Sequence, residues 1–219
     1  MATDVTAAGF TEALAIRSAR EQPLRMGTIF ALAKEHVAMD PAEIELLLDS
    51  PIASARIGGV SVMDRQARLK RTPEPRRREL FDLYLRRHDR IDSWDLVDLG
   101  CQHVIGGYLF EYADSRELLY ELARSKDPWE RRTAIVSTLY FVRKGDVDDT
   151  FALAEILLGD DEHYVQTATG GLLREAGKKD RAALLAFLDR NASRMPRITL
   201  RFATERMEPE LRERYRQTR

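Results

Sequence analysis

The feature that most constrains this fold is a spacing of three and four residues between apolar side chains, which recurs along nearly the whole chain. Segments such as FALAEILLGD, ALLAFLDR and RELLYELAR place those side chains on one face of an α-helix. No stretch of alternating β-branched residues suggests a strand. The pattern predicts an all-α fold in which short loops join antiparallel neighbours. We expect helices near 9–20, 24–37, 41–48, 51–70, 75–87, 91–104, 106–111, 115–125, 128–143, 147–158, 161–176, 178–190, 193–206 and 208–217.

Five of these helices open in a similar way and follow one another at a drifting period. Their openings lie near Ser50, Arg90, Asp127, Asp161 and Arg194, in steps of 40, 37, 34 and 33 residues. A period of this size is typical of HEAT-like helical pairs, which bury their apolar faces only by stacking on their neighbours. We therefore expect residues 1–219 to form one domain, an α-α superhelix curved around a concave groove.

Local signals predict how several helices begin. Asp40, Ser50 and Asp127 each precede a proline that can occupy a first helical turn, so they are candidate N-caps. The small and polar residues 1–8 are expected to fray.

Two glycine pairs, Gly58-Gly59 and Gly170-Gly171, fall inside predicted helices, where glycine costs about 1 kcal/mol relative to alanine. They indicate either close packing of helices or a helix surface left open for a bulky ligand.

The composition limits the classes of partner. Thirty-five basic residues face 36 acidic ones, so only local patches can attract nucleic acid. No apolar run approaches the ~20 residues of a membrane span, and no membrane partner is expected. Cys101 is the only cysteine, which fits a reducing compartment, and we expect a cytoplasmic monomer. Its apolar neighbours favour a buried packing role for Cys101 over a reactive thiol.

Few residues are candidates for catalysis or for binding a metal or cofactor. The four histidines are far apart without metal-ligand spacing, and no phosphate-binding or nucleophile motif is present, so neither metal nor cofactor is expected. In RIDSWDLVDLGCQH, Trp94 and Asp98 lie four residues apart and share a helix face. An aromatic face beside a carboxylate can hold a cation and stabilise developing positive charge. The alternative is a packed indole beside a solvated acid.

Basic residues recur on successive repeats. Arg131 and Arg132 follow Trp129 in PWERRTAIV, and only one of the two arginines can face the same way as Trp94. Further basic residues occur in 65–78, in LREAGKK and in the last repeat. They indicate either solvated surfaces or a cationic groove that grips phosphates. The candidates for binding nucleic acid are Arg131, Arg174, Lys178, Lys179 and Arg201.

Four stretches of this sequence resemble the AlkD-like DNA alkylation repair family of HEAT-repeat DNA glycosylases. They are SWDLVD at 93–98, PWERRTAIVS at 128–137, YVQTATGGLLREAGKKD at 164–180 and RITLRFATERM at 197–207. The resemblance implies a concave cationic groove for duplex DNA. It also implies metal-free cleavage of the N-glycosidic bond of N3- or N7-alkylated purines.

The residues that match the family's catalytic positions are Trp94, Asp98 and Arg132. The resemblance assigns Asp98 to stabilising an oxocarbenium-like sugar and positioning water, Trp94 to contacting the deoxyribose or the cationic nucleotide, and Arg132 to holding a phosphate. The sequence departs from the family at Gly171, where a tryptophan is common, and the aromatic contact from the N-terminal helices has no clear counterpart.

Three functions remain open. Trp94, Asp98 and Arg132 favour an active glycosylase for alkylated DNA. Gly171 favours a paralogue that binds duplex, branched or distorted DNA with weak excision or none. A protein-interaction scaffold is the third, because fold alone does not assign function.

Overall fold

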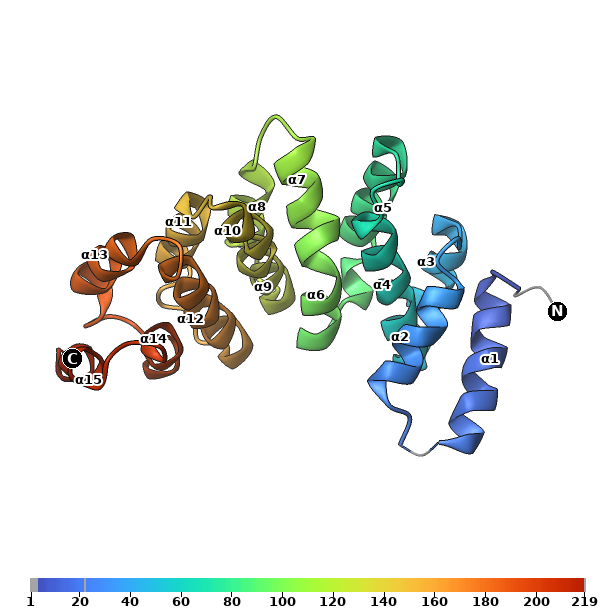
Figure 1. The fold of residues 1–219 in the computed structure, drawn as a ribbon, viewed down its shortest axis with the longest axis horizontal. Coiled ribbons are helices and arrows are strands. Elements are labelled where there is room, and N and C mark those ends of the chain that lie inside the picture. The colour runs from blue at the N-terminus through green and yellow to red at the C-terminus, as the bar shows by residue number, and fades with distance from the viewer. Residues whose placement is uncertain (1–3, 22, 219) are drawn as a thin grey trace. The chain divides into compact units, whose positions relative to one another are not determined.

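A computed structural model describes residues 4–21 and 23–218, and throughout those ranges it contains helices and no strand (Figure 1). This confirms the all-α prediction. The chain divides into two compact units, Met1–Tyr108 and Leu109–Arg219. That the whole chain is one domain stays a prediction. None of the described helices combines the length and apolarity that crossing a membrane requires.

The first unit is built around α4, which packs against α2, α3, α5 and α6. A Cβ on Gly58 would lie 2.2 Å from Cζ of Phe10, and one on Gly59 would lie 3.1 Å from Cβ of Leu47. The first glycine pair therefore serves close packing, one of the two alternatives posed by the sequence. The helices of this unit are α1 (Ala7–Arg20), α2 (Met26–Glu35), α3 (Pro41–Asp49), α4 (Ala53–Arg68), α5 (Glu74–Arg86), η1 (His88–Arg90), α6 (Trp94–Cys101) and the π-helical η2 (Gln102–Gly106).

The short helix α7 (Gly107–Glu111) crosses the boundary, and the second unit is built around α12, which packs against α9, α11, α13 and α14. A Cβ on Gly170 would lie 2.5 Å from the backbone oxygen of Thr199, so this glycine allows α12 and α14 to approach closely. The helices of this unit are α8 (Glu117–Leu122), α9 (Pro128–Ser137), α10 (Leu139–Lys144), α11 (Asp148–Ile156), α12 (His163–Gly177), α13 (Arg181–Asn191), α14 (Arg197–Thr204) and α15 (Pro209–Gln217).

Stacked helical pairs account for the packing inside each unit. In the second unit, α9, α12 and α14 are successive neighbours in one layer, and α11 and α13 pack against α12 from the other (Figure 1). In the first unit, α2, α4 and α6 are successive neighbours in one layer, and α3 packs against α5 in the other. Fully buried side chains fill the space between the layers. They include Phe10, Leu32, Ile44, Leu47, Met63, Leu80 and Tyr84 in the first unit, and Leu173, Phe187, Leu188 and Met195 in the second.

The five repeated openings were predicted within a few residues, but some boundaries were wrong. The helix expected over 128–143 divides at Thr138, whose Oγ1 donates to the carbonyl oxygen of Ile135 at 2.7 Å. The helix expected from residue 178 begins at Arg181, because Asp180 caps it by accepting from the backbone N–H of Ala183 at 2.8 Å. The helix expected over 91–104 changes to π-helical geometry at Gln102.

The predicted N-caps had different outcomes. Asp127 caps α9 as expected, since its carboxylate accepts from the backbone N–H of Trp129 at 2.8 Å. Ser50 was wrong, because it ends α3 and α4 begins only at Ala53. Asp40 stands at the N-cap position of α3 but makes no capping bond, and its carboxylate instead accepts from Arg76 at 3.0 Å.

The first helix begins earlier than predicted. Ala7 and Ala8 form the first turn of α1, and Oγ1 of Thr6 accepts from the backbone N–H of Gly9 at 3.1 Å. Of the residues expected to fray, 1–3 lie outside the described residues. The predicted burial of Cys101 is confirmed, since this residue is 0% exposed.

Candidate nucleic-acid interface

Trp94 and Asp98 lie one turn apart on α6, and both are exposed. Trp94 opens the helix and is 49% exposed, which is unusual for a residue that normally buries its indole. The neighbouring acid, Asp95, is held locally: its Oδ1 accepts from Oγ of Ser93 at 2.5 Å and from the backbone N–H of Leu96 at 3.1 Å. The indole of Trp94 is thus only partly covered, and α6 presents an aromatic ring and a carboxylate on one face.

The end of α6 is tied to α4 by a pair that sequence analysis missed. The π-helical turn η2 follows α6 directly, and within it Nδ1 of His103 lies 2.7 Å from Oδ1 of the buried Asp64. Arg68 lies 3.4 Å from the other oxygen of Asp64. No spacing rule links residues 39 positions apart, so the sequence carries no local signal for this contact. The pair fixes the C-terminal end of the helix that carries Asp98.

Arg132 lies between α9 and α12 and is 7% exposed. Its Nη1 donates to the backbone carbonyl oxygen of Tyr164 in the first turn of α12. This contact supports a role in holding the two helices together. A contact between Arg132 and a DNA phosphate stays a prediction.

The guanidinium of Arg131 is fully engaged in contacts within the protein. Its Nε and Nη2 donate to the two carboxylate oxygens of Asp160 at 2.6 and 3.1 Å, and its Nη1 donates to the carbonyl oxygens of Ser125 and Lys126, both at 3.0 Å. The hydrogen bonds to Asp160 raise the pKa of Arg131. Every guanidinium nitrogen therefore has a partner, so this geometry gives no support to the prediction that Arg131 binds nucleic acid.

The same contact recurs in other repeats at the same helical position. Arg56, Arg131 and Gln166 are each the fourth residue of their helix, α4, α9 and α12 respectively. Each side chain donates to a backbone carbonyl oxygen six residues earlier, on Ser50, Ser125 or Asp160, at 3.3, 3.0 and 2.7 Å. The repeated contact holds the loop that precedes each of these helices.

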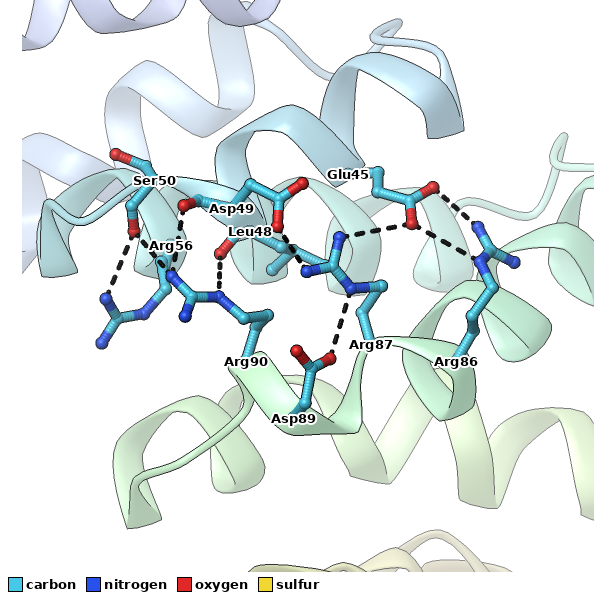
Figure 2. Close-up of polar contacts among 9 residues, drawn as sticks. All are labelled: Glu45, Leu48, Asp49, Ser50, Arg56, Arg86, Arg87, Asp89 and Arg90. Atoms are coloured by element: carbon cyan, nitrogen blue, oxygen red, sulfur yellow. Dashed lines mark hydrogen bonds and ion pairs between the residues drawn. The ribbon is translucent and has the colours of Figure 1, made fainter.

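In the first unit this contact is part of a cluster of arginines around the end of α3 (Figure 2). Arg90 donates to the carbonyl oxygens of Leu48, Asp49 and Ser50 at 3.1, 3.2 and 3.3 Å, which satisfies the last carbonyls of the helix. Arg87 bonds the carboxylate of Asp49 and, at 3.3 Å, that of Glu45. These arginines stabilise the fold and are not available for phosphate.

Glu45 is the acidic centre of this cluster. Nη2 of Arg86 lies 2.8 Å from its Oε2, and Arg87 approaches the other oxygen (Figure 2). The hydrogen bonds from Arg86 and Arg87 hold the pKa of the Glu45 carboxyl below its ordinary value.

The other predicted nucleic-acid contacts fall into two classes. Arg174 and Lys178 are paired on the protein surface: Arg174 bonds Glu205, and Nζ of Lys178 lies 2.7 Å from Glu175. Lys179 and Arg201 are exposed, and neither has an acidic partner among residues 4–21 and 23–218. Arg201 extends over the ring of Phe202, with 5.1 Å between guanidinium carbon and ring centroid. The second class is available to a phosphate backbone.

Gly171 differs from the three other glycines of the two pairs. A Cβ built on Gly171 meets nothing within 4 Å, whereas one on Gly170 collides with the backbone of α14. Tyr164, Thr167 and Gly171 lie on one stripe of α12 at helical spacing. Gly171 therefore leaves an open surface, the second alternative posed by the sequence.

Comparison with known proteins decides the family. The sequence profile described as DNA alkylation repair enzyme matches residues 23–207. The chain belongs to this DNA alkylation repair family. A search of curated proteins found no similar sequence. Membership confirms the resemblance drawn from the four motifs and supports a role in DNA repair. All of the candidate residues considered above, from Trp94 to Arg201, lie inside the matched range.

Proposed function

We propose that this protein is a DNA glycosylase that hydrolyses the N-glycosidic bond of N3- or N7-alkylated purines in duplex DNA. The observation that carries the proposal is the exposed pair on α6, with Trp94 and Asp98 one turn apart. Family membership supports the DNA repair role within which this pair is interpreted.

Hydrolysis of this N-glycosidic bond requires few protein groups besides Trp94 and Asp98. An alkylated purine already carries a positive charge, so it leaves without first taking up a proton. When the bond between C1′ and the base nitrogen breaks, its electrons neutralise the base and the sugar becomes an oxocarbenium-like cation. The carboxylate of Asp98 stabilises that cation, and water adds at C1′ and releases a proton. The face of Trp94 attracts the cationic nucleotide before cleavage.

Exposed arginines of the second unit supply phosphate contacts. Arg197 and Arg201 are four residues apart on α14, so they share a helix face, and both are exposed. The buried Thr199, Leu200 and Ala203 hold the opposite face of α14 in the core. Neither arginine has an acidic partner in the described part of the chain, so a phosphate displaces no ion pair. Arg132 positions α12 through its bond to Tyr164.

The test is release of 7-methylguanine or 3-methyladenine from methylated duplex DNA. The wild type is expected to release the base well above the spontaneous rate, and Asp98→Asn to abolish that release while duplex binding persists. Asp95→Asn is the matched control. Asp95 is bonded to Ser93 and Leu96 at the start of α6, so the Asp95→Asn protein should still release the base. Release by the wild type no faster than spontaneous depurination would refute the proposal.

The open surface at Gly171 favours a second candidate function, the binding of branched or distorted DNA without excision. In that case a gel shift would show tighter binding to a junction than to a duplex of equal length. Asp98→Asn would leave the affinity for both DNAs unchanged. Equal and negligible binding of both DNAs at low salt would count against both candidates.

A further inference from the structure

A row of exposed side chains runs along α1, which lies at the edge of the first unit (Figure 1). The opposite side of the helix is packed into the core through Ala7, Phe10 and Leu14. The exposed residues are spaced by three and four, so they share one helix face, which we call the α1 face. They are Ala8, Glu12, Ala15, Ile16, Ala19 and Arg20. Four of the six are apolar, whereas the solvent face of a surface helix is normally polar.

The α1 face forms one wall of a groove between α1 and α3. The groove has a volume of about 540 Å³, and Ala8, Glu12 and Ala15 line it from α1. Leu46 lines it from α3 and is 57% exposed. Ile16, which follows Ala15 on the α1 face, is 49% exposed. Small alanines beside two large apolar side chains allow a second helix to approach closely.

Contacts to both neighbouring helices hold α1 in place. The backbone N–H of Ala7 donates to the carboxylate of Glu43 on α3 at 2.8 Å. Arg17 donates to both carboxylate oxygens of Glu35 on α2, each at 2.8 Å. A surface that is already ordered loses little conformational entropy when a partner binds.

The charges of the α1 face are arranged to pair with a second copy of the same helix. Glu12 and Arg20 lie on either side of Ile16, and each is displaced from it by about 6 Å along the helix axis. Neither has an oppositely charged partner among residues 4–21 and 23–218. When two copies of α1 pack antiparallel around a two-fold axis at Ile16, Glu12 of each copy therefore faces Arg20 of the other.

We propose that the α1 face is the interface of a homodimer, in which α1 of each copy lies antiparallel along the α1–α3 groove of the other. The two Ile16 side chains meet at the axis, and an ion pair between Glu12 and Arg20 forms on either side of it. This departs from the monomer expected from the sequence, and it does not depend on the proposed function.

The interface is small, because a helix of 14 residues is about 21 Å long. Stable interfaces bury about 1,200–2,000 Å², and one helix face with its groove lies at or below the lower limit. We therefore expect a weak dimer with a dissociation constant of about 10–100 μM, which is mostly monomeric at about 1 μM.

Other occupants of this surface satisfy fewer of its groups. A basic helix from another protein would pair with Glu12 but oppose Arg20 with a like charge, and an acidic helix would do the reverse. An anionic lipid surface would attract Arg20 but repel Glu12. A partner with both charges in the reverse order satisfies the whole face, and α1 of a second copy supplies that order.

Charge reversal tests the pairing. Glu12→Arg and Arg20→Glu each convert two attractive contacts into two repulsive ones, so each variant should dimerise at least about tenfold more weakly than the wild type. Lys126→Glu reverses an exposed charge in the second unit and should dimerise as the wild type does. Sedimentation equilibrium between about 1 and 500 μM brackets the expected dissociation constant, and circular dichroism confirms that each variant is folded.

A mixture of the two variants is the sharpest test. The face of the Glu12→Arg protein carries two cations and that of the Arg20→Glu protein two anions, so an antiparallel pair of them is again complementary at both contacts. The 1:1 mixture should therefore associate about as tightly as the wild type, although neither variant does so alone. The doubly substituted protein Glu12→Arg/Arg20→Glu should dimerise like the wild type.

Three results would overturn the proposal. The first is a wild type that stays monomeric up to about 500 μM. The second is dimerisation that neither Glu12→Arg nor Arg20→Glu weakens, which places the interface elsewhere. The third is a mixture that does not associate, which shows that the helices do not pair antiparallel. Because no DNA takes part, these results are independent of whether the protein excises a base.

Discussion

Arg131 and Asp160 form a two-bond ion pair inside the second unit, with the side chains 14% and 5% exposed. The same guanidinium reaches the two carbonyl oxygens that end the loop before α9. One side chain therefore joins the loop before its own helix to the loop before α12. This explains why Arg131, the first arginine of PWERRTAIV, stabilises the fold instead of facing a ligand.

Arg131→Gln is expected to destabilise the protein by about 3 kcal/mol, because removing one partner leaves Asp160 buried without its counter-charge. Urea denaturation measures the loss. The double variant Arg131→Gln/Asp160→Asn should be more stable than the single one. A loss below about 0.5 kcal/mol in the single variant would show that the pair contributes little.

Arg201→Gln is the opposite case. Arg201 is exposed and has no acidic partner in the described ranges, so the free energy of unfolding should change by no more than about 0.5 kcal/mol. If Arg201 contacts a phosphate, the slope of log K against log salt concentration for duplex binding should fall by about 0.9. Lys179→Gln is a second variant of the same kind, and unchanged slopes in both would remove these residues from the interface.

Because of the arginine cluster of the first unit, the stability of the protein should vary with pH in the acid range. Hydrogen bonds from Arg86, then from Arg87, lower the pKa of Glu45 below the 4.5 of an ordinary glutamate. A lowered folded-state pKa contributes stability that is complete above 4.5 and is lost as the pH falls through the folded-state value. Glu45→Gln should therefore unfold more easily than the wild type at neutral pH, with the difference narrowing as the pH falls below about 4.5.

The matched comparison for Glu45 is Glu12, an exposed glutamate on α1 with no ion pair in the described part of the chain. Glu12→Gln, a surface substitution away from any ion pair, should change the free energy of unfolding at neutral pH by no more than about 0.5 kcal/mol. A wild-type advantage over Glu45→Gln that persists unchanged to low pH would assign the effect of Glu45 to packing instead.

The repeat period and the exposed catalytic candidates were predictable from sequence, because both depend on helical spacing. The helix openings at Ala53, Trp94, Pro128, His163 and Arg197 follow from apolar periodicity and helix-breaking residues. The presentation of Trp94 and Asp98 on one face follows from their separation by one turn.

The roles of the basic residues were not predictable. Arg131 and Arg201 look alike in sequence, yet one is bonded through every guanidinium nitrogen and the other is exposed. Their difference depends on Asp160, which comes from another loop and has no spacing signal. The same holds for Asp64 and His103, which meet through tertiary packing alone.

The glycine pair of α12 predicts two opposite outcomes at adjacent positions. Gly171→Ala should stabilise the protein by about 0.5–1 kcal/mol, because alanine suits a helix interior better and its Cβ meets nothing within 4 Å. Gly170→Ala should destabilise it by about 1–3 kcal/mol, because that Cβ would lie 2.5 Å from the carbonyl oxygen of Thr199. Thermal unfolding of the two variants measures both effects.

Gly171→Trp extends the same argument to function. A Cβ at position 171 meets nothing within 4 Å, so a larger side chain can begin there without a clash, and a ring on the stripe that carries Tyr164 would add an aromatic contact for a cationic lesion. Excision of 7-methylguanine should rise, and preference for junction DNA over duplex should fall. An unfolded Gly171→Trp protein would contradict the accessible space, and unchanged excision and DNA preference would show that this surface does not face DNA.

Whether the contributions of Asp98 and Arg132 to cleavage are coupled is testable by a double-mutant cycle. Asp98→Asn removes the carboxylate on α6, and Arg132→Gln removes the side chain that bonds the carbonyl of Tyr164. If Asp98 stabilises the sugar cation and Arg132 contributes to the same step by holding a phosphate, the double variant should be little slower than the slower single variant, because groups that act as a unit are non-additive. Single-turnover release of 7-methylguanine from saturated enzyme supplies the rates, and the free energy of unfolding of each variant supplies the structural control. If the two losses of activation free energy simply add, Arg132 acts independently of Asp98, as a residue that only joins α9 to α12 would.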